Sequence, residues 1–273
     1  MSNYIHVTIH VTDQFVKDLL VAHLFDKGFE GMEEQPEELN AFIKQDHFDE
    51  AEVKSLLDNY KLPYAVTIVA SQNWNALWES NFEPVVIKDF CIIRADFHDK
   101  DETLPLDIII TPKMSFGTGH HATTYMMVEQ MSYLLFENKK VADFGTGTGI
   151  LAIVAEKLGA SRVRAIDVDD FSIENAVENI ERNKCFKIEV IQADLFSSVE
   201  KFDIILANIN KNVIIDNIQA LATALNAGGK VLLSGLLKED EPDILMACQA
   251  YNLRRVNTLE RNKWISILLE HNI

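Results

Sequence analysis

The chain has 273 residues, 48% of them hydrophobic, and carries a formal net charge of −17. This length favours one medium-sized domain plus a small one, and the apolar content is enough to build a sizeable core. Such a negative charge disfavours tight binding to a nucleic-acid backbone, which needs clustered Lys and Arg; it suits a solvated acidic surface or a basic protein partner.

Residues 1–70 predict a small α+β domain. Residues 4–10 alternate with period two and are rich in β-branched side chains, which is typical of a strand. Thr12 or Asp13 can cap a helix that follows and ends at Gly28. The next expected elements are a strand over 39–44, a helix over 49–59, a strand over 64–70 and a short extra strand near Glu30. This order predicts a split-βαβ, ferredoxin-like sheet.

Residues 71–84 predict a linker helix between this domain and the rest of the chain. Trp74 and Trp78 are four residues apart, which places both rings on one helical face. We interpret this face as one that packs against a domain.

The rest of the chain, residues 85–273, predicts an α/β domain with a mostly parallel sheet. Strands are expected over 85–97 and 106–111, before an apolar helix that ends near Phe136. From Lys140 onward strands and helices alternate, which favours a parallel sheet with helices on both faces. The expected strands are 141–144, 163–168, 188–192, 204–208 and 230–234; the expected helices are 150–158, 171–183, 213–225 and 240–249; a hairpin spans 253–260 and 264–270. The hairpin would end the sheet with an antiparallel strand.

A glycine-rich loop follows the first strand of this alternation and enters a helix. It reads D-F-G-T-G-T-G from Asp143 to Gly149. Glycine lets a ligand approach the backbone closely, and a helix N-terminus favours an anionic group. The dinucleotide fingerprint G-x-G-x-x-G needs a glycine where Ile150 stands, and no Lys-Ser/Thr ending marks a P-loop. The spacing resembles motif I of class I methyltransferases, which would place Gly145 and Gly147 at S-adenosylmethionine; a tight turn without a ligand is the alternative.

Polar residues at the ends of the following strands complete the expected site. Asp167 can accept hydrogen bonds from ribose hydroxyls, and Asp169 can cap the next helix. Asp194 can face the adenine amino group or act as a cap or turn residue. Asn208 ends the fourth strand near the reacting methyl group, where its amide oxygen can accept a hydrogen bond from an amine. Capping of the next helix is the alternative for Asn208.

An earlier segment of the chain formally matches a dinucleotide-binding motif. Residues 117–122, G-T-G-H-H-A, formally match G-x-G-x-x-A, which requires an acid at the end of the following strand. Glu137 lies at the right distance but precedes the strand. The segment is therefore expected beside the glycine loop, as a lid or floor of the cofactor site.

Together these residues resemble the bacterial PrmA family, methyltransferases of ribosomal protein L11, the eleventh protein of the large subunit. The run F-G-T-G-H-H-A-T-T from Phe116 to Thr124 is similar to the family's F-G-T-G-[TH]-H-x-T-T signature, which few other methyltransferases carry. The resemblance runs from about Trp74 to the C-terminus. It implies a class I S-adenosylmethionine methyltransferase domain with a Rossmann-like seven-stranded sheet over 85–273, preceded by a domain that binds the substrate protein.

The resemblance also implies an activity and individual roles. Such enzymes methylate lysine side chains and the N-terminal amine of ribosomal protein L11, and Asn208 would orient the amine. Asn210 departs from the apolar residue frequent in relatives. His121 is a weaker candidate for a general base than for a structural or cofactor-contacting role. The residues implied to contact the cofactor are Thr124, Gly145, Asp167 and Asn208, with Phe116 and His121 nearby.

Several alternatives remain open. Methyltransferases of adenine or amide nitrogen resemble N-P-P-[YF] at the fourth strand, whereas residues 208–210 read N-I-N. A methyltransferase that acts on another protein is a further alternative. So is a non-catalytic regulator that binds the cofactor, which a turnover assay would distinguish from an enzyme. A nicotinamide oxidoreductase is disfavoured by the glycine spacing.

Cysteine usage and the first residues bear on the compartment. Three cysteines, at 91, 185 and 248, form no C-x-x-C pair and no zinc-spaced cluster, so no metal is expected. A sparse, odd count is typical of a reducing compartment. The first ten residues lack the features of a signal peptide, and no run approaches about 20 apolar residues. We expect a cytoplasmic monomer without a membrane segment.

Overall fold

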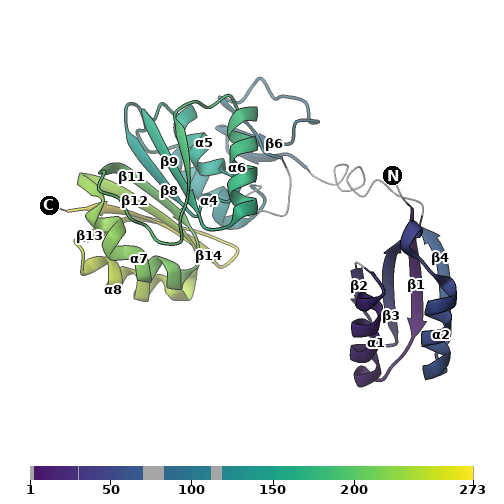
Figure 1. Cartoon of the computed structure of the whole chain (residues 1–273). Helices are drawn as coiled ribbons and strands as arrows, with labels where there is room; N and C mark the ends of the chain where they lie inside the picture. Colours follow the sequence, from purple (N-terminus) through teal and green to yellow (C-terminus); the bar gives the residue numbers. More distant parts are fainter. Residues whose placement is uncertain (1–2, 30, 70–82, 112–118, 273) are drawn as a thin grey trace. The chain divides into compact units, whose positions relative to one another are not determined.

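Figure 1 shows the computed structural model of the chain, which divides into two compact units, residues 1–81 and 82–273. The expected linker helix over 71–84 lies almost wholly outside the described residues. Those described are 3–29, 31–69, 83–111 and 119–272.

The first unit is a four-stranded antiparallel sheet with two helices. Its elements are β1 (Tyr4–His10), α1 (Gln14–Asp26), β2 (Gly31–Glu34), β3 (Glu38–Lys44), η1 (Gln45–His47), α2 (Glu50–Tyr60) and β4 (Tyr64–Val69). The strand order β2-β3-β1-β4 is the ferredoxin-like arrangement that the sequence predicts. Alternate residues of β1 are buried, and Ile5, Val7 and Ile9 share one apolar core with Leu24 and Leu57 of the helices. One face of the sheet is therefore packed against the helices.

The second unit contains the expected seven-stranded sheet, in the order β10-β9-β8-β11-β12-β14-β13. Its strands are β8 (Lys140–Phe144), β9 (Arg162–Asp167), β10 (Ile188–Gln192), β11 (Phe202–Asn208), β12 (Leu225–Leu237), β13 (Leu253–Arg261) and β14 (Trp264–His271). β8 to β12 are parallel to one another, and β14 is antiparallel to both β12 and β13. The predicted hairpin is confirmed, but its antiparallel strand lies inside the sheet and β13 forms the edge.

Helices cover both faces of this sheet (Figure 1). They are α4 (Ala122–Met131), α5 (Ile150–Lys157), α6 (Asp170–Arg182), α7 (Lys211–Thr223) and α8 (Glu241–Gln249), with a short η2 (Lys238–Asp240). Strand β11 shows why two layers are needed. Ile204 and Leu206 pack into the core with α4, α5 and α6, whereas Ile205 and Ala207 pack into the core with α7 and α8. Helix α4 ends at Met131, earlier than expected.

A small three-stranded sheet precedes the large one: β5 (Val85–Ile87), β6 (Cys91–Arg94) and β7 (Leu106–Ile109). The expectation of one strand over 85–97 is wrong. Lys88 has a positive φ of 50°, and the chain turns there so that β5 pairs with β6 as an antiparallel hairpin. Between β6 and β7, Arg94 Nε donates to Asp107 Oδ1 at 2.7 Å and Nη2 donates to Oδ2 at 2.9 Å.

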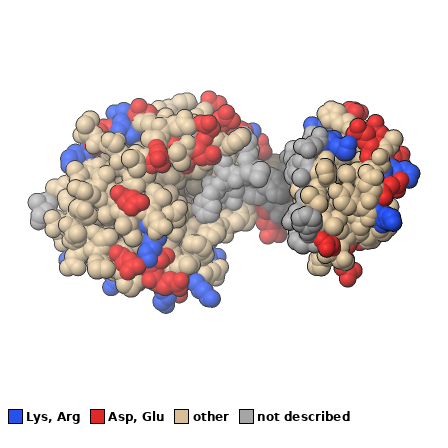
Figure 2. All heavy atoms as spheres, turned by 60° about the horizontal axis from the view of Figure 1, so that its bottom comes forward, with Lys and Arg blue, Asp and Glu red and all other residues tan. Residues whose placement is uncertain are grey.

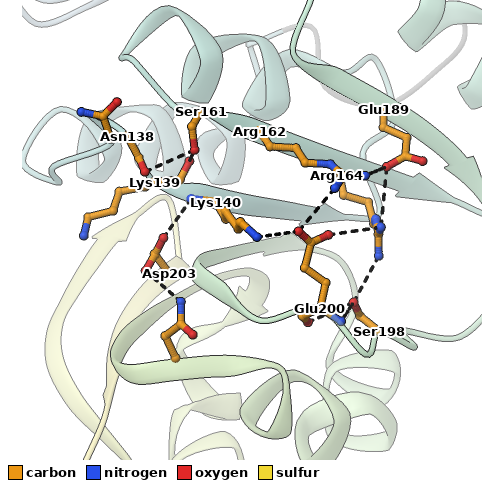
Figure 3. Close-up of polar contacts among 11 residues, drawn as sticks. Asn138, Lys139, Lys140, Ser161, Arg162, Arg164, Glu189, Ser198, Glu200 and Asp203 are labelled. Atoms are coloured by element: carbon orange, nitrogen blue, oxygen red, sulfur yellow. Dashed lines mark hydrogen bonds and ion pairs between the residues drawn. The ribbon is translucent and has the colours of Figure 1, made fainter.

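The amino ends of β8 and β9 carry a network of ion pairs (Figure 3). Glu200 lies 2.8 Å from Lys140 Nζ and 3.3 Å from Arg164 Nη2. Arg162 lies 2.8 Å from Glu189 and 3.4 Å from Glu200. Because Glu200 precedes β11, these pairs also hold the far end of the loop that joins β10 to β11.

Candidate active site

A cavity of about 490 Å³ opens at the carboxyl ends of β8, β9, β10 and β11. The strand order reverses between β8 and β11, which is the switch point where open α/β sheets bind ligands. The volume falls in the range of small-molecule and cofactor pockets. Of the residues predicted for the site, His121, Gly145, Gly147, Asp167, Asp194 and Asn208 line it.

The glycine loop after β8 is fastened to the neighbouring strand β9. The amide of Gly145 donates to Ile166 O at 2.8 Å, and the amide of Gly147 donates to Asp167 Oδ2 at 2.8 Å. Gly149 is the N-cap of α5 and has no side chain to satisfy the free amides of the first turn. An anionic ligand group at that helix end would be favoured by the helix dipole.

Asp143 lies beneath the loop and is fully buried. Its Oδ2 accepts from Thr146 Oγ1 at 2.6 Å and from the amide of Ala152 at 3.2 Å. Its Oδ1 is buried without a hydrogen-bond partner among the residues that the structure describes. Burial raises the pKa of this carboxyl to about 7, although both hydrogen bonds oppose the rise.

Asp167 ends β9 at the rim of the cavity. Besides Gly147, its carboxylate accepts from the amides of Val168 at 2.8 Å and Asp169 at 3.1 Å. These bonds hold the carboxylate in place, and its oxygens have further lone pairs for ligand hydroxyls. Asp169 caps α6 through the amide of Ser172 at 2.9 Å, as the sequence predicts.

Asn208 is the last residue of β11, where it pairs with Ser234 of β12. Its Nδ2 donates to Thr124 Oγ1 at 3.4 Å. Its Oδ1 is buried, and no donor in the described part of the chain reaches it. The alternative role as a helix cap is wrong, because Asn210 caps α7 through the amide of Val213 at 3.2 Å.

The remaining predicted residues differ in where they lie. Asp194 is exposed in the loop after β10. Thr124 is fully buried in the first turn of α4 behind Asn208 and does not line the cavity. Phe116, together with residues 117 and 118 of the signature, lies outside the described residues.

His121 caps α4. Its Nδ1 accepts from the amide of Thr123 at 3.3 Å and lies 2.7 Å from Thr123 Oγ1. Its ring meets the Trp264 ring edge to face, with centroids 4.8 Å apart. Burial lowers the pKa of His121, which favours the neutral ring that a cap requires.

The residues that line the cavity without having been predicted from the sequence include Phe144, Ile209, Gly235 and Trp264. Trp264 begins β14, opposite Leu237 of β12. Because β14 is antiparallel, its first residue lies at the edge where the parallel strands end. The sequence pattern predicts the hairpin that contains Trp264. It does not place Trp264 at the cavity, because that requires knowing that β14 pairs with β12.

Known sequences resemble the chain over nearly all of its length. The family model described as "Ribosomal protein L11 methyltransferase (PrmA)" matches residues 7–272. A protein of Porphyromonas gingivalis named ribosomal protein L11 methyltransferase is 41% identical, covering 96% of this chain and 93% of its own. A Bacteroides fragilis protein of the same name is 35% identical, covering 94% of this chain and 95% of its own.

Solved structures also resemble a large part of the chain. The structure of ribosomal protein L11 methylase from Lactobacillus delbrueckii subsp. bulgaricus is 30% identical, with a TM-score of 0.65, covering 70% of this chain and 100% of that one. A methyltransferase from Pyrococcus furiosus is 20% identical, with a TM-score of 0.53, covering 61% of this chain and 90% of that one. The latter is similar in fold alone.

Proposed function

Because the chain belongs to the PrmA family of ribosomal protein L11 methyltransferases, we propose that it transfers methyl groups from S-adenosylmethionine to amine nitrogens of ribosomal protein L11. The acceptors are lysine side chains and the N-terminal amine. The observation that carries this proposal is the buried Oδ1 of Asn208 at the cavity, which accepts no hydrogen bond from any residue described. A buried acceptor of this kind costs stability unless a ligand supplies the donor.

The cavity suits S-adenosylmethionine, which supplies an electrophilic methyl group on a positively charged sulfur. Asp167 would accept from the ribose hydroxyls, and the α5 N-terminus would receive the methionyl carboxylate. Asp194 would face the adenine amino group. Gly145 and Gly147 would let the cofactor lie against the main chain, with Thr124 held behind Asn208.

The amine must be neutral to act as a nucleophile. Lysine has an ordinary pKa near 10.4, so deprotonation at pH 7 costs about 4–5 kcal/mol. The apolar side chains of Phe144, Ile209 and Trp264 line the cavity and would disfavour the charged amine, as would the nearby sulfonium charge. Asn208 Oδ1 would accept from the amine N–H and so direct the nitrogen lone pair. We assign no base role to His121, whose ring caps α4.

We also propose that residues 1–70 recognise the substrate protein and are joined through residues 71–84 to the catalytic domain, residues 85–273. Residues 1–81 contain 14 Asp and Glu but five Lys and Arg, a net charge of −9 in less than a third of the chain. Figure 2 shows acidic side chains among the basic ones on the visible face of this unit. This charge favours encounter with a basic protein.

The charge and cysteines support three further parts of the proposal. The net charge of −17 opposes nucleic-acid binding, and the buried Cys91, Cys185 and Cys248 are free thiols, as in a reducing compartment. We therefore place the protein in the cytoplasm, as a monomer that does not bind nucleic acid. No helix in the described ranges is long and apolar enough to cross a membrane.

The test is incubation of the purified protein with labelled S-adenosylmethionine and the separated components of the large ribosomal subunit. We expect label on ribosomal protein L11, and peptide mass spectrometry should place it on lysines and the N-terminal amine. Label on ribosomal RNA, or on no large-subunit protein, would contradict the proposal.

A further inference from the structure

The turn that follows β11 is enclosed by two glycines from different parts of the chain. A Cβ atom on Gly145 would lie 2.1 Å from Cγ2 of Ile209. A Cβ atom on Gly235 would lie 2.2 Å from the carbonyl oxygen of Ile209 and 2.7 Å from its carbonyl carbon. The side chain of Ile209 therefore packs against Gly145, and its main chain packs against Gly235.

The position of Gly235 is fixed by its backbone conformation and by the hydrogen bonds of its neighbour. It lies in an irregularity of β12 between Leu233 and Leu236 and has a φ of 82°, a conformation that other residues rarely adopt. Its neighbour Ser234 accepts from the amide of Ile209 at 3.2 Å and donates through Oγ to Ile265 O at 2.8 Å. The glycine thus presents a fixed surface to the turn.

We propose that Gly235 is a positioning residue for methyl transfer. Its missing side chain lets the Ile209 carbonyl settle against β12, and this contact sets where Asn208 Oδ1 stands in the cavity. The inference rests on the proposed function, in which Asn208 orients the amine.

The cofactor side of the cavity is held by other contacts. The glycine loop and Asp167 are fastened to each other and to Ile166 of β9, on the opposite side of β8 from β12. A methyl group on Gly235 would push on the main chain of residue 209, which cannot rotate away as a side chain can. Substitution should therefore impair turnover while leaving cofactor binding intact.

The first experiment compares Gly235→Ala with Gly228→Ala. Gly228 has a similar φ of 70°, but a Cβ there would meet nothing within 4 Å, so it controls for backbone strain. At saturating S-adenosylmethionine, Gly235→Ala should lower kcat on the order of 100-fold through misplacement of Asn208. Calorimetric Kd for S-adenosylhomocysteine should be the same in both variants and the wild type. Wild-type turnover in Gly235→Ala would overturn the proposal.

A second comparison uses Ile209→Ala. Gly145→Ala should also lower kcat, because its new Cβ meets Cγ2 of Ile209, and adding Ile209→Ala should restore part of that loss by removing this atom. Combined with Gly235→Ala it should restore nothing, because the atoms in the way belong to the main chain. Equal rescue of both glycine variants would refute the main-chain contact.

A third readout is independent of the substrate. With S-adenosylhomocysteine bound, the NMR resonances of the Asn208 side-chain amide should move in Gly235→Ala and stay in place in Gly228→Ala. Unmoved resonances in Gly235→Ala would overturn the inference, whatever the substrate of the enzyme is. Absence of methylation of any ribosomal protein would refute the proposed function instead, and the NMR result does not depend on it. If Gly235→Ala folds poorly, Ser234→Ala removes the bond to Ile265 and should lower kcat without changing Kd; wild-type kcat in that variant would overturn the proposal.

Discussion

The two ends of the main sheet differ in how their polar groups are satisfied. At the amino ends of β8 and β9, cationic side chains are paired with Glu189 and Glu200, and Arg164 Nε is a buried atom there without a described partner. At the carboxyl ends, Asp143 Oδ1 and Asn208 Oδ1 are buried and receive no hydrogen bond within residues 3–29, 31–69, 83–111 and 119–272.

This difference separates stability from function along the same strands. Paired charges at a sheet end add modestly to stability, whereas buried unpaired acceptors reduce it. Proteins retain such costs where a ligand completes the set of contacts. Substitutions at the carboxyl ends should therefore affect turnover and binding, and substitutions at the amino ends should affect stability alone.

The largest effect is expected for Asn208→Ala. Loss of the group that directs the amine should lower kcat on the order of 100-fold. The midpoint of thermal unfolding should change little, because the variant removes a buried unpaired acceptor together with the 3.4 Å hydrogen bond to Thr124. Asn226→Ala is the matched control at the amino ends, where Asn226 Nδ2 donates to Asp203 Oδ1 at 2.9 Å; it should keep wild-type kcat. Full turnover in Asn208→Ala would remove its proposed role.

Asp167→Ala should act on binding. A charged hydrogen-bond acceptor contributes about 1.5–3 kcal/mol, so Kd for S-adenosylmethionine should rise about 10- to 100-fold. Calorimetry measures this change, and kcat at saturating cofactor should change far less. Asp203→Asn, at the amino ends, should leave Kd unaltered. Equal Kd values for Asp167→Ala and the wild type would exclude Asp167 from the cofactor site.

Asp143 should make stability depend on pH. The unfolded chain ionises this group near its ordinary pKa of 3.8, whereas burial raises the folded pKa to about 7. Between these values the folded protein holds a proton that the unfolded chain has lost. Its contribution to the free energy of unfolding therefore falls as pH rises through this window, by up to about 1.4 kcal/mol per pH unit, and levels off above it. Urea unfolding from pH 4 to 8 should show that Asp143→Asn removes this slope.

The smallest effect is expected at the amino ends. Glu200→Gln weakens its ion pairs and should lower the free energy of unfolding by about 1 kcal/mol or less, with kcat unchanged. Asp58→Asn breaks an exposed pair with Lys54 and should have no measurable effect. A fall in kcat for Glu200→Gln would contradict this separation. It would show that a change at the amino ends alters the cavity through the loop between β10 and β11.

The cofactor side of the cavity follows from the sequence because its rules are local. Glycine spacing and the residue at each strand end place Gly145, Asp167 and Asn208 at one edge, and all three line the cavity. Gly235 and Trp264 could not be placed in this way. Their positions depend on an irregularity in β12 and on the insertion of β14 beside it, both of which arise from long-range pairing.

Prediction from local pattern was wrong at residues 85–97, where a backbone turn interrupts the expected strand. The turn at Lys88 divides residues 85–97, expected as one strand, into β5 and β6, although lysine rarely adopts a positive φ. Hydrophobic pattern does not predict a turn at a lysine, because it carries no information on φ at that residue. Thr124 lies behind Asn208 and accepts from its Nδ2 at 3.4 Å, and its implied contact with the cofactor stays a prediction.

The place of β14 has a consequence for how the protein is made. Strand β13 is synthesised before β14, but in the sheet β14 lies between β12 and β13. While the chain grows, β13 has no neighbouring strand to join, and its backbone groups remain unpaired until β14 emerges. Assembly of this part of the sheet therefore runs against the order of translation. A released chain truncated between residues 261 and 264 would leave β13 as an unpaired strand, a form prone to aggregate.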